Sequence, residues 1–290
     1  MFLFLALCPG VAAPACEVPD YHIAPPAGWC AGIGGFADAD YATPGVANEL
    51  VMVERAFSGS WYPGSSGFAI GLDLGYRNYE VDEEIGANLD LYQFSLRPQW
   101  RVKGEVRDWL LRLAATRAVS SNRAADVNWH ADEMFYSSAA IARQALDDRR
   151  TLVYGAAYDY SFGKAALYPV AGVELDLTPH WQLALIVPFT RLHWDGGGRW
   201  AAQFRLYPAG RRWRVLDSDT GRDFDTFTRE FRLSAELHWR LDSRWQLVAT
   251  LAGGFNRSLT TSAANGSRLA ADVDPAPFGA IGLRYRSGRN

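Results

Sequence analysis

Apolar and polar residues alternate with a period of two along most of the chain from residue 67 onward. In residues 67–77 every second side chain is large and apolar, and the residues between them are small or charged. The apolar set consists of Phe68, Ile70, Leu72, Leu74 and Tyr76. The same alternation recurs in residues 92–101 and 230–239. This period predicts β-strands with one oily face, and about ten residues is the length that a tilted strand needs to cross a bilayer.

The alternating segments predict about twelve strands, and ten to fourteen fit the pattern. They lie at residues 67–77, 89–101, 108–116, 134–145, 151–160, 165–177, 180–192, 199–207, 212–216, 227–240, 245–256 and 276–285. Short connections at 102–107, 146–150, 178–179, 208–211 and 241–244 alternate with longer ones at 78–88, 117–133, 217–226 and 257–275. Shorter links near Phe162 and Gly196 are expected on the same side as the longer ones. Outer-membrane barrels have short periplasmic turns and longer extracellular loops. We therefore predict an all-β fold, a closed antiparallel transmembrane β-barrel.

Tryptophans distinguish this barrel from a soluble β-sandwich, whose strands also alternate. Four polar turns are each followed at once by a tryptophan that begins an apolar alternation, and two more tryptophans end strands that enter such turns. The first four are Trp109, Trp181, Trp213 and Trp245, and the other two are Trp100 and Trp239. Indole rings prefer the boundary between lipid and water. We therefore predict a belt of aromatic side chains at the periplasmic membrane interface; cross-strand packing at hairpin ends is the alternative.

The N-terminus has the features of an export signal. Residues 1–15 are mostly apolar and end in the small-x-small sequence Ala13-Pro14-Ala15, although no Lys or Arg precedes the apolar core. Cleavage there would leave Cys16 and Cys30 as the only thiols, which predicts a disulfide between them in an oxidising compartment. Lipidation of Cys16 is the alternative.

Residues 16–64 are rich in Ala, Pro and Gly and show little sustained periodicity. They predict a periplasmic extension, a plug in the lumen or one irregular strand. The expected organisation is therefore a signal peptide at 1–15, this segment at 16–64, and the barrel at 65–290.

The chain resembles bacterial outer-membrane β-barrel proteins of uncharacterised families. The resemblance is strongest over residues 167–194, LYPVAGVELDLTPHWQLALIVPFTRLHW, where a strand containing proline, a turn before tryptophan and a second proline follow one another. It extends loosely over residues 67–285. The resemblance implies a location in the outer membrane and transfers no functional residues.

Composition and charge narrow the functions further. The formal net charge of the 290 residues is -3, which gives no basic field for nucleic acid, and no apolar run of about 18 residues occurs. The alternate strand positions, on the face opposite the apolar one, carry charges of both signs. This suits a hydrated lumen or a lattice of ion pairs. The expected lumen-facing residues are Asp73, Arg97, Arg101, Arg112, Glu174, Asp176, Arg205, Glu230, Arg232 and Glu236. Both a narrow channel and a structural surface protein agree with this pattern.

Catalytic and metal-binding motifs are lacking in the sequence. The five histidines show no metal-ligand spacing, and there is no nucleophile elbow or phosphate loop. We expect no enzyme activity, no cofactor and no metal. The alternative is an outer-membrane enzyme acting on lipid or peptide at the rim, with His130 beside Asp126 or Asp132. The expected partners are outer-membrane lipid, the barrel-assembly machinery and small solutes.

Overall fold

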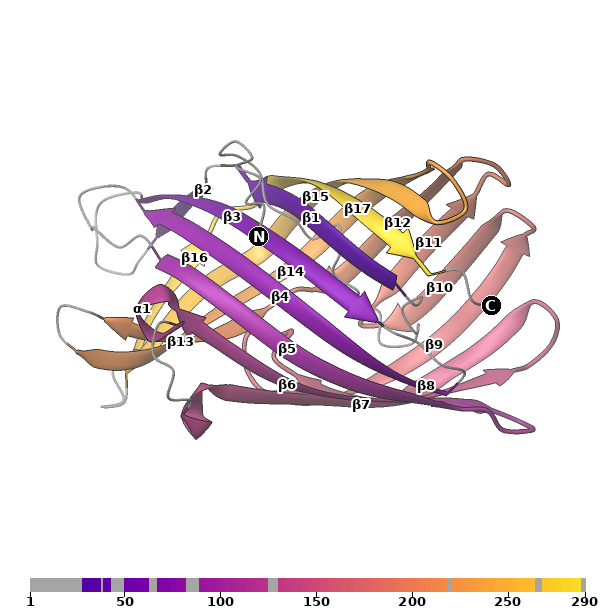
Figure 1. Ribbon diagram of the computed structural model, residues 1–290, viewed down its shortest axis with the longest axis horizontal. Helices are drawn as coiled ribbons and strands as arrows, with labels where there is room; N and C mark the ends of the chain where they lie inside the picture. The colour runs from indigo at the N-terminus through magenta and orange to yellow at the C-terminus, as the bar shows by residue number, and fades with distance from the viewer. Residues whose placement is uncertain are drawn as a thin grey trace, which may run out of the picture.

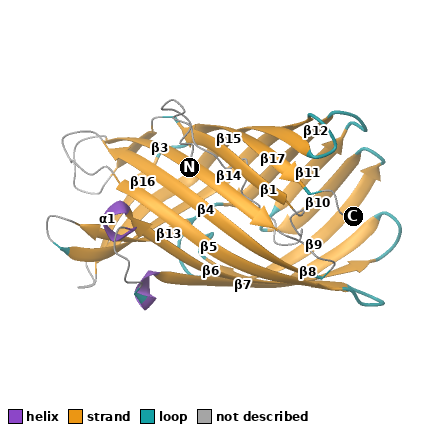
Figure 2. Ribbon diagram, in the orientation of Figure 1, coloured by secondary structure: helices purple, strands orange, loops and turns teal. Residues whose placement is uncertain are grey.

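The computed structural model describes residues 28–37, 39–42, 50–62, 67–81, 89–124, 130–217, 221–263 and 268–287. These residues form one antiparallel β-barrel (Figure 1), as the alternation predicts. Short helical segments, α1 (Ser121–Ala124) and η1 (Ala131–Glu133), lie together at one end (Figure 2). The strands form a single closed sheet and not two packed layers, so the soluble sandwich is excluded.

Fourteen described strands form a wide ring that closes where β1 pairs with β17. In ring order they are β1 (Gly28–Phe36), β3 (Leu50–Tyr62), β4 (Phe68–Val81), β5 (Leu89–Val102), β6 (Asp108–Ser120), β7 (Met134–Ala145), β8 (Arg150–Asp159), β9 (Ala166–Thr178), β10 (Trp181–Val187), β11 (Thr190–Asp195), β12 (Trp200–Pro208), β14 (Arg222–Arg240), β15 (Trp245–Ala263) and β17 (Ala276–Arg286). The count lies at the upper limit of the expected range. We call the end of this ring that carries the connections 103–107, 146–149, 179–180, 196–199 and 241–244 the wide end.

At the opposite end the barrel narrows to a second ring, which we call the neck. Here β2 (Ala39–Ala42) and β16 (Arg268–Val273) continue the wall above β1 and β17, and β13 (Arg211–Asp217) joins β14 to β6. The neck therefore consists of the nine described strands β2, β3, β4, β5, β6, β13, β14, β15 and β16. A single strand, β13, replaces the six strands β7 to β12.

Local irregularities mark the height at which the barrel narrows. A bulge interrupts the pairing of β14 and β15 between Arg229 and Phe231. Nearby, Asn256 adopts a φ of 50°, in the left-handed region that asparagine tolerates better than most residues. At this point β15 changes partner, from β17 up to Gly254 to β16 from Arg257. Bulges bend strands and re-aim side chains, and this bend lets one strand serve both rings.

The expected boundary at residue 65 is wrong as a limit of the barrel, because β1 and β3 are wall strands. In β1 the inward positions are mostly glycine, so the chain lacks the polar inward residues that make alternation visible. Trp29 and Ile33 lie on the outward parity. Cys30 is disulfide-bonded. Its expected partner Cys16 and the expected signal peptide at 1–15 lie outside the described residues.

Residues 180–192, expected to be one strand, form a hairpin of β10 and β11 that turns at Pro188 and Phe189. Proline has no N–H to donate to a strand ladder, so the strand breaks there. This extra reversal moves the next two connections to the opposite ends from those expected. The connection at 196–199 lies at the wide end, and the connection between Pro208 and Arg211 lies beneath the neck.

The outer wall of the barrel is apolar. On β14, for example, Leu233 is 57% exposed, whereas its neighbours Arg232 and Ser234 are each 1% exposed. Other exposed apolar residues on the strands are Ile33, Leu74, Tyr92, Phe94, Leu96, Leu113, Leu185, Phe204, Leu237, Leu251 and Ile281. In a single-layered barrel the exposed parity faces outward. An outer wall of this kind needs a hydrocarbon environment, so the strands span a membrane.

Candidate functional site: the charged interior of the barrel

Buried ion pairs line much of the interior of the wide ring. Glu236, on β14, is 3% exposed and accepts hydrogen bonds from Arg205 and Gln203 of the neighbouring strand β12. The Nε2 atom of His238 lies 3.3 Å from the same carboxylate. The expected residues Arg205 and Glu236 therefore form one cluster with two side chains from the same two strands.

Two further ion pairs join expected residues to other strands. Arg97 on β5 is bound to Asp73 on the neighbouring strand β4. Glu174 on β9 is bound, across β8, to Arg143 on β7, which the expected set did not include because the alternation in β7 is weak. The first pair is of the kind that a cross-strand lattice predicts, and the second spans two strand spacings.

A layer of arginines lies inside the barrel where the wide ring meets the neck. Glu230 binds Arg232 and, at 3.4 Å, Arg257 of β15. The guanidinium groups of Arg232 and Arg257 lie 5.0 and 4.2 Å from the ring centre of Phe36. The arginine layer is thus in direct contact with the apolar interior of the neck.

The structure separates Arg101 and Asp176 from these clusters. Both are exposed near the wide end, where solvent reaches them. Arg112 lies inside, 9% exposed, and its Nε donates to Gln99 at 3.3 Å. Interior arginines outside the expected set include Arg143, Arg191, Arg211 and Arg257. The last two flank the barrel's change in width, where strand register cannot be read from alternation.

The interior also contains an apolar wall. Ile141, Val153, Val170, Ala184 and Ile186 are 0% exposed and pack together on β7 to β10. Apolar side chains therefore fill this part of the wide ring.

The neck is filled by apolar and aromatic side chains. Its core includes Tyr79 on β4, Leu91 on β5, Ala118 on β6, Trp213 on β13 and Val273 on β16. A ring of about eight strands is just wide enough for its own side chains to fill, and this nine-stranded neck behaves in the same way.

Trp213 was expected in the membrane-interface belt, and that prediction is wrong. It is 1% exposed and its ring lies 6.2 Å from that of Tyr79 in the neck. The alternation that begins at Trp213 belongs to β13, whose start lies beneath the neck and not at the wide end. An apolar residue after a polar turn thus indicates where a strand starts in the sequence. It does not indicate where along the barrel axis that strand starts.

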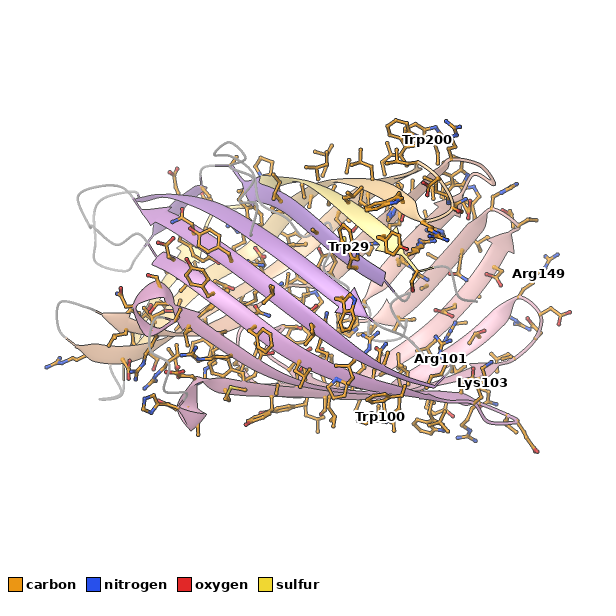
Figure 3. All side chains as sticks on the ribbon, viewed as in Figure 1. Trp29, Trp100, Arg101, Lys103, Arg149 and Trp200 are labelled. Atoms are coloured by element: carbon orange, nitrogen blue, oxygen red, sulfur yellow. The ribbon has the colours of Figure 1, made fainter. Side chains whose placement is uncertain are left out.

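The other five expected belt residues lie near the wide end. Trp100, Trp181 and Trp239 are each 37% exposed, and Trp109 and Trp245 are half-buried. Ring contacts link this group to tryptophans outside the expected set. The pairs are Trp29 with Trp245 at 5.4 Å, Trp181 with Trp194 at 6.4 Å and Trp200 with Trp239 at 5.5 Å. Figure 3 shows Trp100 and Trp200 on the outside, with Arg101, Lys103 and Arg149 further toward the wide end.

Aspartates fix the tight turns at the wide end. The backbone N–H groups of Arg244 and Trp245 donate to Asp242, at 2.7 and 2.8 Å, and lower the pKa of its carboxyl group. The pKa of Asp147 is lowered mainly by a hydrogen bond from the side chain of Arg150. Both turns thus carry local caps that hold the adjacent strands in register.

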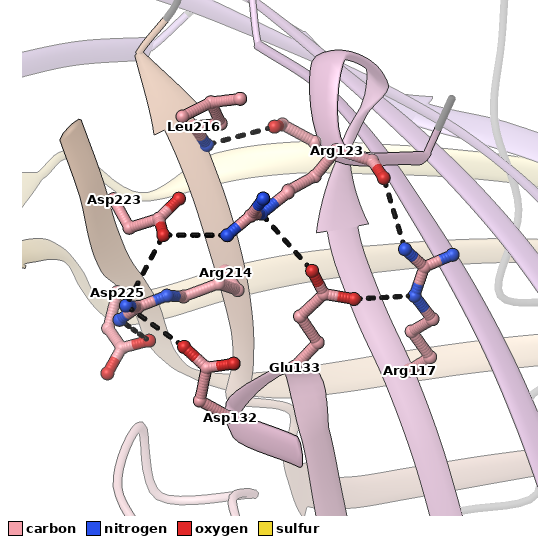
Figure 4. A network of polar contacts seen from close by, with 9 residues as sticks. Arg117, Arg123, Asp132, Glu133, Arg214, Leu216, Asp223 and Asp225 are labelled. Atoms are coloured by element: carbon pink, nitrogen blue, oxygen red, sulfur yellow. Dashed lines mark hydrogen bonds and ion pairs between the residues drawn. The ribbon is translucent and has the colours of Figure 1, made fainter. Parts of the chain in front are cut away.

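Beside the neck, a network of ion pairs connects α1 and η1 to β13 and β14 (Figure 4). Glu133 is 0% exposed and lies between Arg117, at 2.8 Å, and Arg123, at 3.1 Å. Arg123 also binds Asp223 of β14 at 2.8 Å. Arg214 of β13 binds Asp132 at 3.2 Å. The acidic residues Asp132 and Asp223 are thus each bound to an arginine.

The structure does not bring together the residues expected for an enzyme at the rim. His130 is exposed, Asp132 is bound to Arg214, and Asp126 lies outside the described residues. Within the described ranges, no group of three or more His, Cys, Asp or Glu side chains could hold a metal ion.

No helix in the described part of the chain is long and apolar enough to cross a membrane.

The chain is similar to several solved structures. No protein-family model matches the chain, and no curated protein matches it. Among solved structures it is similar to the KdgM porin, at 8% identity and a TM-score of 0.37, over 88% of this chain and 99% of that one. It is also similar to the P. putida toluene transporter TodX, at 10% identity and a TM-score of 0.35, over 97% of this chain and 94% of that one. Similarity to an outer-membrane channel from Pseudomonas putida F1 has 11% identity and a TM-score of 0.39, over 93% of this chain and 98% of that one.

These likenesses reach no further than barrel shape, and none supplies a binding site. The closed antiparallel ring, the apolar outer wall and the aromatic residues at one end are the features that decide the class. The protein is a β-barrel of the bacterial outer membrane.

Proposed function

We propose that the protein is a narrow channel for small hydrophilic solutes. The observation that carries this proposal is the contrast between the two faces of the wide ring. The outer face consists of apolar side chains. On the inner face, Arg205, Glu236 and Arg232 lie at the centre of ion-pair clusters. A lumen that served only to be filled would need no such charges, because well-packed apolar residues replace buried ion pairs at little cost.

The short turns at the wide end support an orientation with that end in the periplasm and the neck toward the outside. The membrane lipid contacts the apolar wall, and the charged side of the interior forms the solute path. Assembly by the barrel-assembly machinery is expected of any such barrel.

Planar-bilayer recording of the purified, folded barrel tests the proposal. We expect discrete current steps whose size changes in the variants Arg97→Gln, Arg112→Gln and Glu236→Gln. Folding is verified by heat-dependent migration on a gel. A folded barrel that conducts no current at any voltage, in the parent chain and in Trp213→Ala alike, would show that the protein is a structural barrel and not a channel.

A further inference from the structure

Among the described strands of the neck, the seam between β6 and β13 has the fewest backbone pairings. Across it the only backbone pairing among described residues is the parallel bridge of Arg214 with Val119. Two side-chain contacts support the bridge. The Oγ of Ser120 accepts from the N–H of Leu216 at 3.1 Å, and the amide of Asn122 donates to the carbonyl of Leu216 at 3.3 Å.

The other edge of β13 is bonded along its whole length. Every residue of β13, from Arg211 to Asp217, pairs with β14, and β14 in turn pairs with β15 up to Ala263. The hairpin of β13 and β14 is therefore a firm unit, and only one of its edges is lightly attached.

Ion pairs hold that light edge in place. Two of them cross the seam directly: Arg123 with Asp223 at 2.8 Å, and Arg214 with Asp132 at 3.2 Å. Arg123 is itself held by Glu133, which is fully buried between two arginines. Figure 4 shows this chain of contacts running from β6, through η1, to the hairpin. The seam is thus held by ion pairs and side-chain packing in place of a strand ladder.

The position of β13 decides whether the neck is filled. Trp213 and Val215 are 1% and 2% exposed and belong to the core that closes the narrow ring. If the hairpin moves away from β6, both side chains leave that core together. The remaining neck strands cannot close on their own, because β7 to β12 end below this height.

We propose that the hairpin of β13 and β14 is the gate of the barrel and that the ion pairs across its seam with β6 are the latch. Breaking the latch lets β13 separate from β6, withdraws Trp213 from the neck and joins the charged interior to the outside. This proposal rests on the proposed channel function for its consequence, but the movement itself can be measured without any current.

A thiol placed in the neck core measures the movement. Ala118 on β6 is 1% exposed, so Ala118→Cys should react slowly with a water-soluble thiol reagent. In the background Asp132→Asn with Asp223→Asn, which removes the carboxylate charge of both ion pairs across the seam but keeps side-chain shape, we expect labelling at least tenfold faster. The matched control is Asp147→Asn, which breaks an exposed ion pair with Arg150 at the wide end and should leave the labelling rate unchanged.

Chains without Ala118→Cys give the blank, and heat-dependent gel migration verifies that each variant is folded. An unchanged labelling rate in the folded latch variant overturns the gate. Faster labelling without any current in a bilayer supports the gate and contradicts the channel function.

A disulfide that holds the seam closed tests the same proposal. Val119 and Arg214 are bridge partners, which is close enough for a disulfide. In Val119→Cys with Arg214→Cys, the oxidised protein should conduct at least tenfold less than the reduced protein. Thr226→Cys with Thr261→Cys is the control, since it links two neck strands that already share a ladder. Oxidation should leave its conductance unchanged, and the parent chain treated with reductant controls for Cys30. Equal conductance of the oxidised and reduced seam variants would overturn the gate.

Discussion

Inside the barrel, single charged side chains depend on their partners. Glu236 is bound by Arg205, and their side chains are 1% and 5% exposed. Replacing Glu236 by leucine leaves the guanidinium of Arg205 buried without this carboxylate, and breaking a buried pair costs about 3–5 kcal/mol. We expect Glu236→Leu to lower the free energy of unfolding by roughly that amount. Urea unfolding in lipid vesicles, followed by tryptophan fluorescence, measures it.

The double variant Arg205→Leu with Glu236→Leu is the control for this prediction. It removes both charges together, so it should be more stable than the single variant. A double variant that is less stable than Glu236→Leu alone would contradict the assignment of the cost to an unpaired charge.

The sequence predicts, residue by residue, which face of a strand a side chain occupies. It does not predict the position of that side chain along the barrel axis. Glu236, Arg232 and Glu230 were expected inside and are buried there. Trp213 was expected on the outer surface and lies in the neck. The alternation around it is the same in both places, because period two reports which face a side chain occupies and carries no information about distance along the barrel axis.

Among the elements, β13 contributes the largest side chain that fills the neck. Trp213 is 1% exposed in the neck, and deleting a buried tryptophan leaves a cavity where the core cannot fully collapse. We expect Trp213→Ala to increase the conductance in a planar bilayer and to lower the free energy of unfolding by about 3–5 kcal/mol.

Trp239→Ala is the matched control for the neck variant, because Trp239 is 37% exposed near the wide end. It should leave the conductance unchanged. If the two variants raise the conductance equally, the neck is not the constriction.

Element boundaries were hidden from the sequence wherever the inward residues are small. The inward positions of β1 include Gly32 and Gly34, so the contrast between its two faces is weak. The hairpin at Pro188 was hidden for a different reason. Both of its strands are short and apolar, and together they have the length expected for one crossing strand. Continuous apolar runs do not reveal a reversal unless turn residues mark it.

On the scale of the whole molecule, the outer wall predicts a dependence of stability on depth. Leu233 lies in mid-strand on β14 and is 57% exposed, whereas Leu241 lies in the turn after Arg240. Arginine on the lipid face costs about 2–4 kcal/mol at the bilayer midplane and about 0–1 near the interface. We therefore expect Leu233→Arg to lower the free energy of unfolding in vesicles far more than Leu241→Arg. Equal losses would contradict a membrane around β14.

The balance of charge on the inner wall predicts which ions pass. Among the described residues of the wide ring, arginines on the inward face outnumber carboxylates. Away from the strand ends at the wide end, the arginines are Arg77, Arg97, Arg112, Arg143, Arg191, Arg205, Arg232, Arg257 and Arg284, and the carboxylates are Asp73, Asp159, Glu174, Glu230 and Glu236. A passage walled by one excess charge concentrates ions of the opposite sign.

We therefore expect the channel to prefer anions. Across a bilayer with unequal KCl concentrations, the reversal potential should have the sign that chloride sets. Arg284→Gln, which removes one charge of the inner wall, should shift the reversal potential toward zero, whereas Arg150→Gln, an exposed residue at the wide end, should not. High salt should weaken the preference, because ions screen fixed charges over about 3 Å at 1 M. A reversal potential with the sign of potassium would show that fixed charges other than these arginines control the path.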